Sequence, residues 1–265
     1  MQLQLEGKTA LVTGSYRGTG LIIARQLLAE GVEVWVHGLE TGQAEAAVQE
    51  LGGGIPVTGD ITTEAGSESL FGALADHRRG TLGDCPEILI NNYGTATPGG
   101  WTSSNSGDWI DAYQNNVLSA GRLIAHFLPA MKEASWGRII NLGTVGSTRP
   151  NARMPHYYAA KGALATMTIS LAKEVAGTGI RVNLVSPGLI LTPEVRAAYL
   201  ASGKKKGWGS TWEEVEPHIA RDIPIGRIVT REEVAALVTF LSSPLADGIH
   251  GQNIRIDGGA LDILS

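Results

Sequence analysis

Short runs of Val, Ile and Leu alternate along the chain with longer segments in which apolar residues recur every three or four positions. The short runs predict strands buried on both faces, and the longer segments predict helices with one apolar side. Regular alternation of the two predicts parallel strands joined by crossover helices. We therefore expect one α/β domain over residues 1–265, built on a doubly wound, seven-stranded parallel sheet with helices on both faces.

The predicted elements follow one another in a regular order. Strands are expected at Thr9–Thr13, Glu33–His37, Ile55–Val57, Ile88–Asn91, Arg138–Leu142, Arg181–Val185 and Asn253–Ile256. Helices are expected at Thr19–Glu30, Gln43–Leu51, Glu64–Arg78, Trp109–Lys132, Tyr157–Ala176 and Glu232–Leu241.

The segment Thr192–Ile223 interrupts this order. Two polar helical pieces flank a stretch that holds Lys204, Lys205 and Lys206 and is followed by Trp208 and Trp212. A long excursion between a strand and a helix is typical of an active-site lid. We expect a substrate lid at about residues 192–223, with its lysines in a solvated loop.

Composition narrows the classes of function. The chain is 43% hydrophobic and 18% charged, and its net charge of −5 argues against nucleic acid as a partner. Cys85 is the only cysteine, which excludes an intrachain disulfide and suits a reducing compartment. The start lacks an apolar leader, and no run reaches the ~18 apolar residues of a membrane span. We therefore expect a cytoplasmic protein that does not associate with a membrane.

A glycine-rich turn directly follows the first predicted strand and precedes the first predicted helix. It reads Gly14-Ser15-Tyr16-Arg17-Gly18-Thr19-Gly20. Glycines let the backbone approach a pyrophosphate, and the amides and dipole at a helix N-terminus meet its charge. This turn predicts a dinucleotide site, although three glycines alone also fit an ordinary tight turn.

Further motifs follow in register: Asp60-Ile61, Asn91-Asn92-Tyr93-Gly94, Asn116, Tyr157-x-x-x-Lys161 and Pro187-Gly188-x-Ile190-x-Thr192. With the glycine turn they resemble the short-chain dehydrogenase/reductase family over the whole chain, with most similarity to members of the 3-oxoacyl-[acyl-carrier-protein] reductase type. The resemblance implies a Rossmann-type fold, a nicotinamide cofactor, hydride transfer between a carbonyl and a secondary alcohol, and a homotetramer built on the helices Trp109–Lys132 and Tyr157–Ala176 and the last strand.

The end of the second strand discriminates between NAD and NADP. An acid there favours NAD, because it accepts from the ribose hydroxyls and repels a 2′-phosphate. This chain has Gly38 where the resemblance places that Asp, and Leu39 where many NADP enzymes have Arg. The resemblance implies that Arg17 reaches the 2′-phosphate, so we expect NADP. Glu40 would favour NAD if it reached the ribose, and NAD stays an alternative.

The resemblance assigns the remaining cofactor contacts. Asp60 would accept from the adenine amino group beside the Ile61 backbone, although it could instead cap the helix that starts near Thr62. Tyr93 replaces a small residue of the family and is expected to pack. The full set of expected cofactor-binding residues is Gly14, Ser15, Tyr16, Arg17, Gly18, Thr19, Gly20, Leu39, Asp60, Ile61, Asn92, Gly94, Tyr157, Lys161, Pro187, Gly188, Ile190 and Thr192.

Reduction of a carbonyl needs an acid that works near neutral pH. Tyr157 and Lys161 are four residues apart and share a helix face. An ammonium about 4 Å from the phenol is worth about 4 kcal/mol at an effective dielectric constant of ~20, which would bring the pKa of Tyr157 close to 7. We expect Tyr157 to be the acid/base and Lys161 to tune it and, by resemblance, to bind the nicotinamide ribose.

Two further residues complete the expected catalytic set. Thr144 stands thirteen residues before Tyr157, where the family has Ser. It keeps a hydroxyl that can donate to the substrate oxygen, but its methyl group crowds the site, so we expect retained activity with a narrower substrate range. Asn116 is implied to hold a water beside Lys161 and extend a proton relay; a helix bend is the alternative. The sequence shows no clustered ligand set, and we expect no catalytic metal.

The leading hypothesis is an NADP(H)-dependent oxidoreductase that interconverts a small-molecule carbonyl and a secondary alcohol. An NAD-dependent alcohol or polyol dehydrogenase is the second hypothesis. A dinucleotide-binding sensor without catalysis is the third, and Thr144 and Tyr93 are the features that favour it.

Overall fold

The computed structural model describes residues 2–76 and 85–263, and its main feature is one parallel sheet. The seven strands lie in the order β3-β2-β1-β4-β5-β6-β9. Their bounds are Thr9–Val12 (β1), Glu33–Gly38 (β2), Ile55–Thr58 (β3), Ile88–Asn91 (β4), Gly137–Leu142 (β5), Ile180–Pro187 (β6) and Asn253–Ile256 (β9). The predicted seven-stranded parallel sheet is confirmed.

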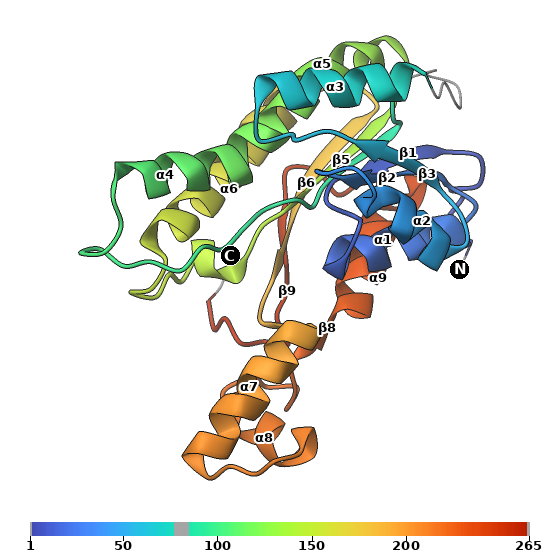
Figure 1. The fold of residues 1–265 in the computed structure, drawn as a ribbon. Helices are drawn as coiled ribbons and strands as arrows, with labels where there is room; N and C mark the ends of the chain where they lie inside the picture. The colour runs from blue at the N-terminus through green and yellow to red at the C-terminus, as the bar shows by residue number, and fades with distance from the viewer. Residues whose placement is uncertain (1, 77–84, 264–265) are drawn as a thin grey trace.

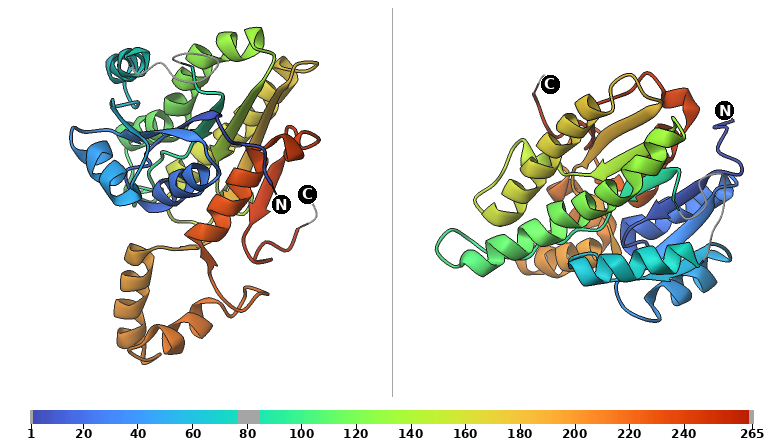
Figure 2. Two further views of the ribbon diagram at one scale, coloured as in Figure 1. Left: turned by 90° about the vertical axis from the view of Figure 1, so that its right-hand side faces the viewer. Right: turned by 90° about the horizontal axis from the view of Figure 1, so that it is seen from above.

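Helices cover both faces of this sheet (Figures 1 and 2). One face carries α1 (Gly18–Ala29), α2 (Gln43–Leu51) and α9 (Arg231–Leu241); the other carries α3 (Glu64–Ala75), α5 (Ser119–Glu133) and α6 (Pro155–Glu174). Neighbouring residues of one strand point to opposite faces of the sheet. Val12 packs in the apolar cluster with α1 and α9, and Leu11 packs in the cluster with α3 and α5. This explains the continuous apolar strands in the sequence.

The strand order reverses between β1 and β4. The chain runs from β1 to β2 and β3 on one side, and then crosses to β4 and the strands beyond it. In open parallel sheets a crevice forms at the carboxyl ends of the strands at such a point, and ligands bind there. The fold therefore places a binding site where β1 and β4 end.

The helix predicted at Trp109–Lys132 is interrupted. The structure has α4 (Ser106–Tyr113), one π-helical turn η1 (Gln114–Leu118) and then α5. Within η1, the side-chain amide of Asn116 donates to the carbonyl of Ala112, four residues back, at 3.0 Å. The side chain thus takes an acceptor that normally serves the helix backbone, which accounts for the widened turn.

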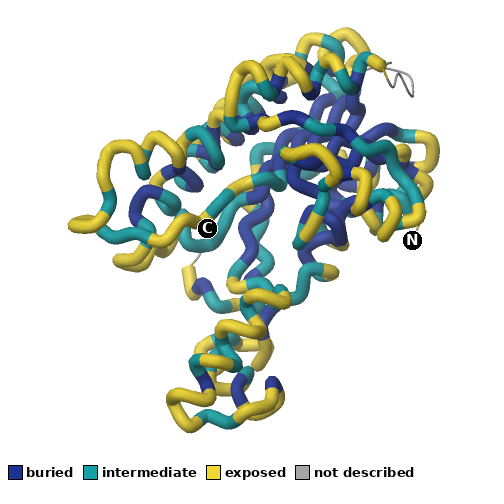
Figure 3. Tube along the Cα trace, in the orientation of Figure 1, coloured by how far each residue is buried: buried dark blue, intermediate teal, exposed yellow. Residues whose placement is uncertain are grey.

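The excursion predicted at Thr192–Ile223 consists mainly of α7 (Pro193–Lys206) and α8 (Trp212–Ile219), with a small sheet of β7 (Ile190–Leu191) and β8 (Val229–Thr230) at its base. The two helices extend away from the main sheet and are largely exposed (Figures 1 and 3). The prediction that the three lysines lie in a loop is wrong. They form the last turn of α7, where cations interact favourably with the helix dipole.

The predicted helix Glu64–Arg78 ends at Ala75 in the structure, and its end at Arg78 lies outside the described residues. Within the described residues, no helix has the length and apolar character that crossing a bilayer requires.

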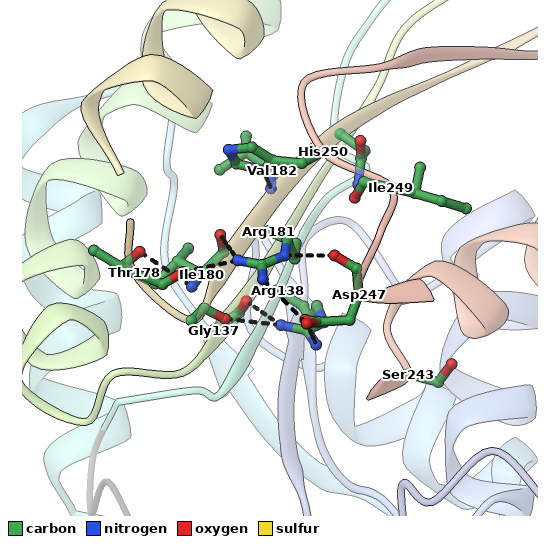
Figure 4. Close-up of polar contacts among 12 residues, drawn as sticks. Gly137, Arg138, Thr178, Ile180, Arg181, Val182, Ser243, Asp247, Ile249 and His250 are labelled. Carbon is green, nitrogen blue, oxygen red and sulfur yellow. Dashed lines mark hydrogen bonds and ion pairs between the residues drawn. The ribbon is translucent and has the colours of Figure 1, made fainter. Parts of the chain in front are cut away.

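An arginine pair holds the edge of the sheet opposite the crevice (Figure 4). Arg138 on β5 is 1% exposed and donates to Asp247 Oδ1 at 3.0 Å, while Arg181 on β6 donates to Asp247 Oδ2 at 3.1 Å. Asp247 follows the short 3-10 turn η3 (Pro244–Ala246), so this carboxylate fixes the chain between α9 and β9 against the two strands. The C-terminal segment is thereby held in place for its return to the site.

Candidate active site

The glycine turn adopts the backbone shape that its sequence predicts. Gly14 and Gly18 have φ values of +62° and +63°, which side chains rarely tolerate. A Cβ atom at Gly20 would lie 2.5 Å from the amide nitrogen of Asn92 and 2.8 Å from the Gly14 carbonyl. Ser15 is fully buried and its hydroxyl donates to the Val12 carbonyl at 2.7 Å, so Ser15 and Gly20 shape the turn from within.

His37, which the sequence reasoning missed, ties three strand ends together at this turn. It is fully buried, its Nδ1 accepts from the Gly14 N–H at 2.9 Å, and its Nε2 lies 2.8 Å from the Gly59 carbonyl. Burial lowers the pKa of His37 to about 4, so the ring is neutral and Nε2 carries the proton that Gly59 accepts. A lone histidine inside an apolar strand beside the glycine turn was the available clue.

The loop after β2 is closed by Gln43, the second residue that sequence reasoning missed. Gln43 Oε1 accepts from the backbone amides of Leu39 and Glu40, at 2.9 and 3.2 Å, and its Nε2 donates to the Glu40 carboxylate at 3.3 Å. A Cβ atom at Gly38 would come within 2.8 Å of Gln43 Cβ. The Asp that favours NAD therefore has no room at position 38 in this backbone.

Arg17 lies at the start of α1, exposed, with its guanidinium 5.3 Å from the centre of the Tyr16 ring. The first turn of α1 contains no acidic residue. Unpaired amides, the helix dipole and this guanidinium make the region attractive to phosphate groups.

Asn92 and Tyr93 connect the end of β4 to the end of β1. Asn92 donates from its side chain to the Thr13 carbonyl at 2.8 Å, and the Tyr93 N–H donates to the Thr13 hydroxyl at 2.9 Å. The Tyr93 ring lies against Gly14, and burial raises the pKa of Tyr93 to about 12. The phenol therefore stays protonated at neutral pH and packs, as expected.

These segments enclose a cleft of about 430 Å³ at the point where β1 and β4 end. Twelve of the predicted residues line it: Gly14, Tyr16, Arg17, Gly18, Thr19, Leu39, Asn92, Gly94, Tyr157, Lys161, Pro187 and Ile190. Glu40, Gln43, Tyr93, Thr95, Leu142 and Gly143 complete the wall. The sequence motifs thus converge on one elongated site.

Helix α6 carries Tyr157 and Lys161 into this cleft. A chain of buried polar contacts fixes the helix, since Asn91 donates to Asn141 Oδ1 at 2.8 Å and Asn141 donates to the Thr168 hydroxyl of α6 at 2.9 Å. Within the described residues no side chain or backbone group hydrogen-bonds the Tyr157 hydroxyl. That hydroxyl is available to a ligand.

Lys161 and Asn116 meet at Gly94. A Cβ atom at Gly94 would lie 2.6 Å from Asn116 Oδ1 and 3.0 Å from Lys161 Nζ, so only glycine allows both side chains to approach. Asn116 is 1% exposed and donates to the Thr95 and Ala112 carbonyls, whereas its Oδ1 is buried without a partner. A buried amide oxygen beside an ammonium is suited to binding a bridging water.

The expected lowering of the Tyr157 pKa by Lys161 is wrong for the protein chain alone. Burial raises the pKa of Tyr157 to about 12, with Tyr158 adding to the rise, and Lys161 is not among the groups that shift it. Lys161 is 4% exposed and donates to the Leu142 carbonyl at 2.8 Å, and burial lowers its own pKa to about 8. The effect that helical spacing predicts is absent because the ammonium is turned toward β5.

Thr144 and Gly188 lie in a separate cavity of about 310 Å³ rather than in the main cleft. Thr144 caps the 3-10 turn η2 (Val145–Ser147), where its hydroxyl oxygen accepts from the Gly146 N–H at 3.2 Å. The hydroxyl proton stays free to be donated.

Six predicted cofactor residues do not line the main cleft: Ser15, Gly20 and Gly188, described above, and Asp60, Ile61 and Thr192. Thr192 caps α7, accepting from the Val195 N–H at 3.2 Å, and lines a third cavity against α9. Asp60 is exposed and accepts from the Thr62 hydroxyl at 2.6 Å, while Thr63 rather than Asp60 caps α3. Ile61 is buried in the core at 1% exposed, so only its backbone can serve a ligand.

The site fits a dinucleotide on its own geometry. It pairs glycines at positive φ with an unblocked helix N-terminus, and it ends at a buried, unpartnered amide oxygen. Among the described residues, no group of three or more His, Cys, Asp or Glu side chains is placed to hold a metal ion.

Comparison with known proteins decides the family. Residues 14–260 match the model of a family described as "Enoyl-(Acyl carrier protein) reductase". The chain belongs to the short-chain dehydrogenase/reductase family. It is therefore an oxidoreductase of a class that acts on CH–OH groups with NAD(P). The pattern of the related enoyl reductases, in which six residues separate Tyr from Lys, is absent, because the residue at that spacing before Lys161 is Met154.

Relatives of this short-chain dehydrogenase/reductase differ in their substrates. The chain is 33% identical to the 3-oxoacyl-[acyl-carrier-protein] reductase FabG of Salmonella typhimurium, over 97% of this chain and 98% of that protein. It is 34% identical to the D-beta-hydroxybutyrate dehydrogenase of Cupriavidus necator, over 96% and 98%. The structure of L-sorbose reductase from Gluconobacter frateurii, complexed with NADPH and L-sorbose, superposes over all of both chains with a TM-score of 0.90 and 29% identity.

Proposed function

We propose that this short-chain dehydrogenase/reductase is an NADPH-dependent reductase that interconverts a small-molecule carbonyl and a secondary alcohol. The convergence of Tyr157, Lys161 and Asn116 at the end of the dinucleotide cleft carries this proposal. A non-catalytic sensor would not require a phenol and a buried ammonium in the same cleft. The similarity to reductases and to a hydroxybutyrate dehydrogenase supports the same chemistry.

Tyr157 is the proposed proton donor, and Thr144 orients the carbonyl by donating its free hydroxyl proton. Bound NADPH would supply the hydride. Lys161 holds the nicotinamide ribose and, with Asn116 Oδ1 and water, carries a proton from solvent back to Tyr157 after each reduction. Because burial raises the pKa of Tyr157 to about 12, the phenol is fully protonated before reduction, and its proton passes to the oxygen as negative charge develops there.

The proposed cofactor contacts follow the cleft. Gly14, Gly18 and Thr19 at the N-terminus of α1 face the pyrophosphate, Pro187 and Ile190 face the nicotinamide, and Arg17 binds the 2′-phosphate. The similarity to L-sorbose reductase, whose structure is a complex with NADPH, supports NADP. Ser15 and Gly20 act indirectly, because they shape the glycine turn. Thr192 caps the N-terminus of α7, where the proposed lid begins.

NAD-dependent oxidation of an alcohol is the second candidate, and Glu40 is the observation that favours it. Glu40 lines the same cleft as Arg17 and accepts a hydrogen bond from Gln43. A carboxylate at this place can accept from ribose hydroxyls and repel a 2′-phosphate.

Fluorescence titration of the protein with NADPH and with NADH tests the two candidates. One charge-assisted hydrogen bond from Arg17 is worth about 1.5–3 kcal/mol, so NADPH is expected to bind about 10- to 100-fold more tightly. Arg17→Gln should abolish the difference, and Glu40→Gln should increase it. Equal or tighter binding of NADH by the unmodified protein would support the dehydrogenase.

Three wider expectations belong to the same proposal. Residues 192–223 close over bound substrate as a lid, since α7 and α8 stand apart from the sheet body (Figure 1). The protein works in the cytoplasm. It assembles as a homotetramer through the α4–α5 and α6 region and β9.

A further inference from the structure

A small cavity opens beside Thr144, the residue proposed to orient the carbonyl. It measures about 310 Å³ and is also lined by Gly188, the neighbour of the proposed nicotinamide contact Pro187. Ligand pockets commonly span about 300–1,000 Å³, so this one suits a small molecule rather than a long acyl chain.

The Asp257-Gly258-Gly259 motif near the C-terminus positions one wall of this cavity, which Ala260 and Leu261 line. Asp257 is 7% exposed, and its two carboxylate oxygens accept from the Gly259 and Leu261 amides, both at 2.9 Å. A Cβ atom at Gly188 would lie 2.9 Å from Asp257 Cβ, so the turn after β6 and the C-terminal segment pack directly together. The wall formed by Ala260 and Leu261 is therefore fixed beside the reacting end of the site.

The lining of this cavity presents a single full charge. Among the residues that line the cavity, Arg149 alone is ionised, and it lies one turn beyond Val145, with its N–H donating to the Val145 carbonyl at 3.0 Å. The Tyr158 ring packs against Gly146 and so supports the turn η2. The backbone of Arg149 thus has a defined position relative to Thr144.

In this structure Arg149 is paired with a carboxylate of the chain itself. Arg149 Nη1 lies 2.8 Å from Asp262 Oδ1, and the two side chains are 66% and 80% exposed. An exposed pair of this kind contributes little to stability, so a ligand carboxylate can replace Asp262 at little cost. The Asp257 carboxylate cannot compete, because its oxygens are taken by backbone amides.

We infer that Arg149 is the anion-recognition residue of the substrate site, and that the substrate is a short carbonyl or hydroxy compound with a carboxylate. The inference rests on the proposed function for the position of the reacting carbonyl. Arg149 binds the carboxylate through its planar fork while Thr144 holds the oxygen to be reduced. The Asn151 side chain donates to the Tyr158 hydroxyl at 2.9 Å, so this hydroxyl can donate its own proton to the ligand. In the free protein the Asp262 carboxylate pairs with Arg149, and a bound substrate carboxylate would displace it.

D-Gluconate and D-glucitol test this inference because they differ only in a terminal carboxylate in place of a CH₂OH group. Calorimetric titration of each into the protein saturated with NADPH gives affinities without turnover. We expect gluconate to bind about tenfold more tightly than glucitol, the size of a charge-assisted contact that is partly exposed. Arg149→Gln should remove this preference, Arg149→Lys should retain part of it, and Asp262→Asn should increase it.

Arg153→Gln is the matched control, since Arg153 is an exposed arginine of the same loop that does not line the cavity. Its preference for gluconate should equal that of the unmodified protein. Equal affinity for the two ligands, a preference that survives in Arg149→Gln, or no binding of gluconate would overturn the inference. NADPH binding and Tyr157-dependent turnover are measured separately, so a protein that keeps both and fails only here contradicts the anion site and not the proposed function.

Discussion

At the scale of single residues, His37 shows how the cofactor turn depends on a neutral, buried side chain. Its ring connects the Gly14 amide to the Gly59 carbonyl and therefore needs one protonated and one unprotonated nitrogen. Protonation would place a second donor against the Gly14 N–H. The state of this ring at neutral pH is thus part of the site's geometry.

We predict that His37 makes the protein sensitive to acid. Its pKa is about 4 when folded and 6.5 in the reference state, so the unfolded chain binds more protons between these values. The free energy of unfolding should therefore fall as pH drops from 6.5 toward 4, by up to about 3 kcal/mol from this residue. Urea unfolding of the unmodified protein and of His37→Asn at several pH values measures this contribution.

His37→Asn should lose much less stability than the unmodified protein over the same interval, because an amide does not titrate. His218→Asn, which removes an exposed histidine of α8, serves as the control and should keep the original pH dependence. Identical acid profiles for His37→Asn and the unmodified protein would show that His37 does not titrate as described.

The residues of the site were predictable to different degrees. Gly14, Lys161 and Gly94 belong to motifs with fixed spacing, and the structure brings them to one cleft. Gln43 was not predictable, because its role depends on the loop conformation that presents the Leu39 and Glu40 amides to it. The prediction of a lowered Tyr157 pKa was wrong for a related reason. Sequence spacing does not show that the Lys161 ammonium turns toward the Leu142 carbonyl.

At the scale of secondary-structure elements, the buried parallel strands were the most predictable part. Their apolar runs are short and bounded by glycines, and the observed bounds differ from the expected ones by at most two residues. The π-helical turn at Gln114–Leu118 was not predicted, because it depends on the Asn116 side chain competing for the Ala112 carbonyl. The two-residue strands β7 and β8 are too short to leave a pattern.

The Arg138–Asp247 contact should stabilise the junction between β5, β6 and η3. Asp247→Ala would leave the buried Arg138 guanidinium without its carboxylate, and we expect a loss of about 2–3 kcal/mol in the free energy of unfolding. Chemical denaturation measures the change. Glu50→Ala, which breaks the exposed Arg25–Glu50 pair, is the control and should cost about 0–1 kcal/mol. Equal losses for the two variants would contradict the account.

At the scale of the whole molecule, exposed apolar side chains on the neighbouring helices α4, η1 and α6 suit the proposed assembly. Ile110 on α4 and Ile169 on α6 are 60% and 47% exposed, and Tyr113 and Leu118 extend the same helical layer. Exposed apolar surface of this kind is typical of an interface. These side chains are exposed in the single chain. The expectation of a homotetramer comes from the family resemblance of the sequence.

We predict that sedimentation velocity gives a mass near four times the 27.9 kDa of one chain. Ile110→Asp and Ile169→Asp should produce smaller species, because a carboxylate would be buried unpaired between subunits. Unchanged thermal melting of an isolated smaller species would show that the chain still folds. A monomer of the unmodified protein at micromolar concentration would contradict the proposed assembly.

The most direct test of the central claim compares the unmodified protein with Tyr157→Phe. NADPH oxidation is followed with L-sorbose and ethyl acetoacetate, and NADPH binding is titrated in parallel. If Tyr157 donates the proton, the variant should bind NADPH with nearly unchanged affinity and lose about 10²–10⁴-fold in turnover, as removal of a general acid does. Turnover that survives the substitution, with NADPH still bound, would contradict the account.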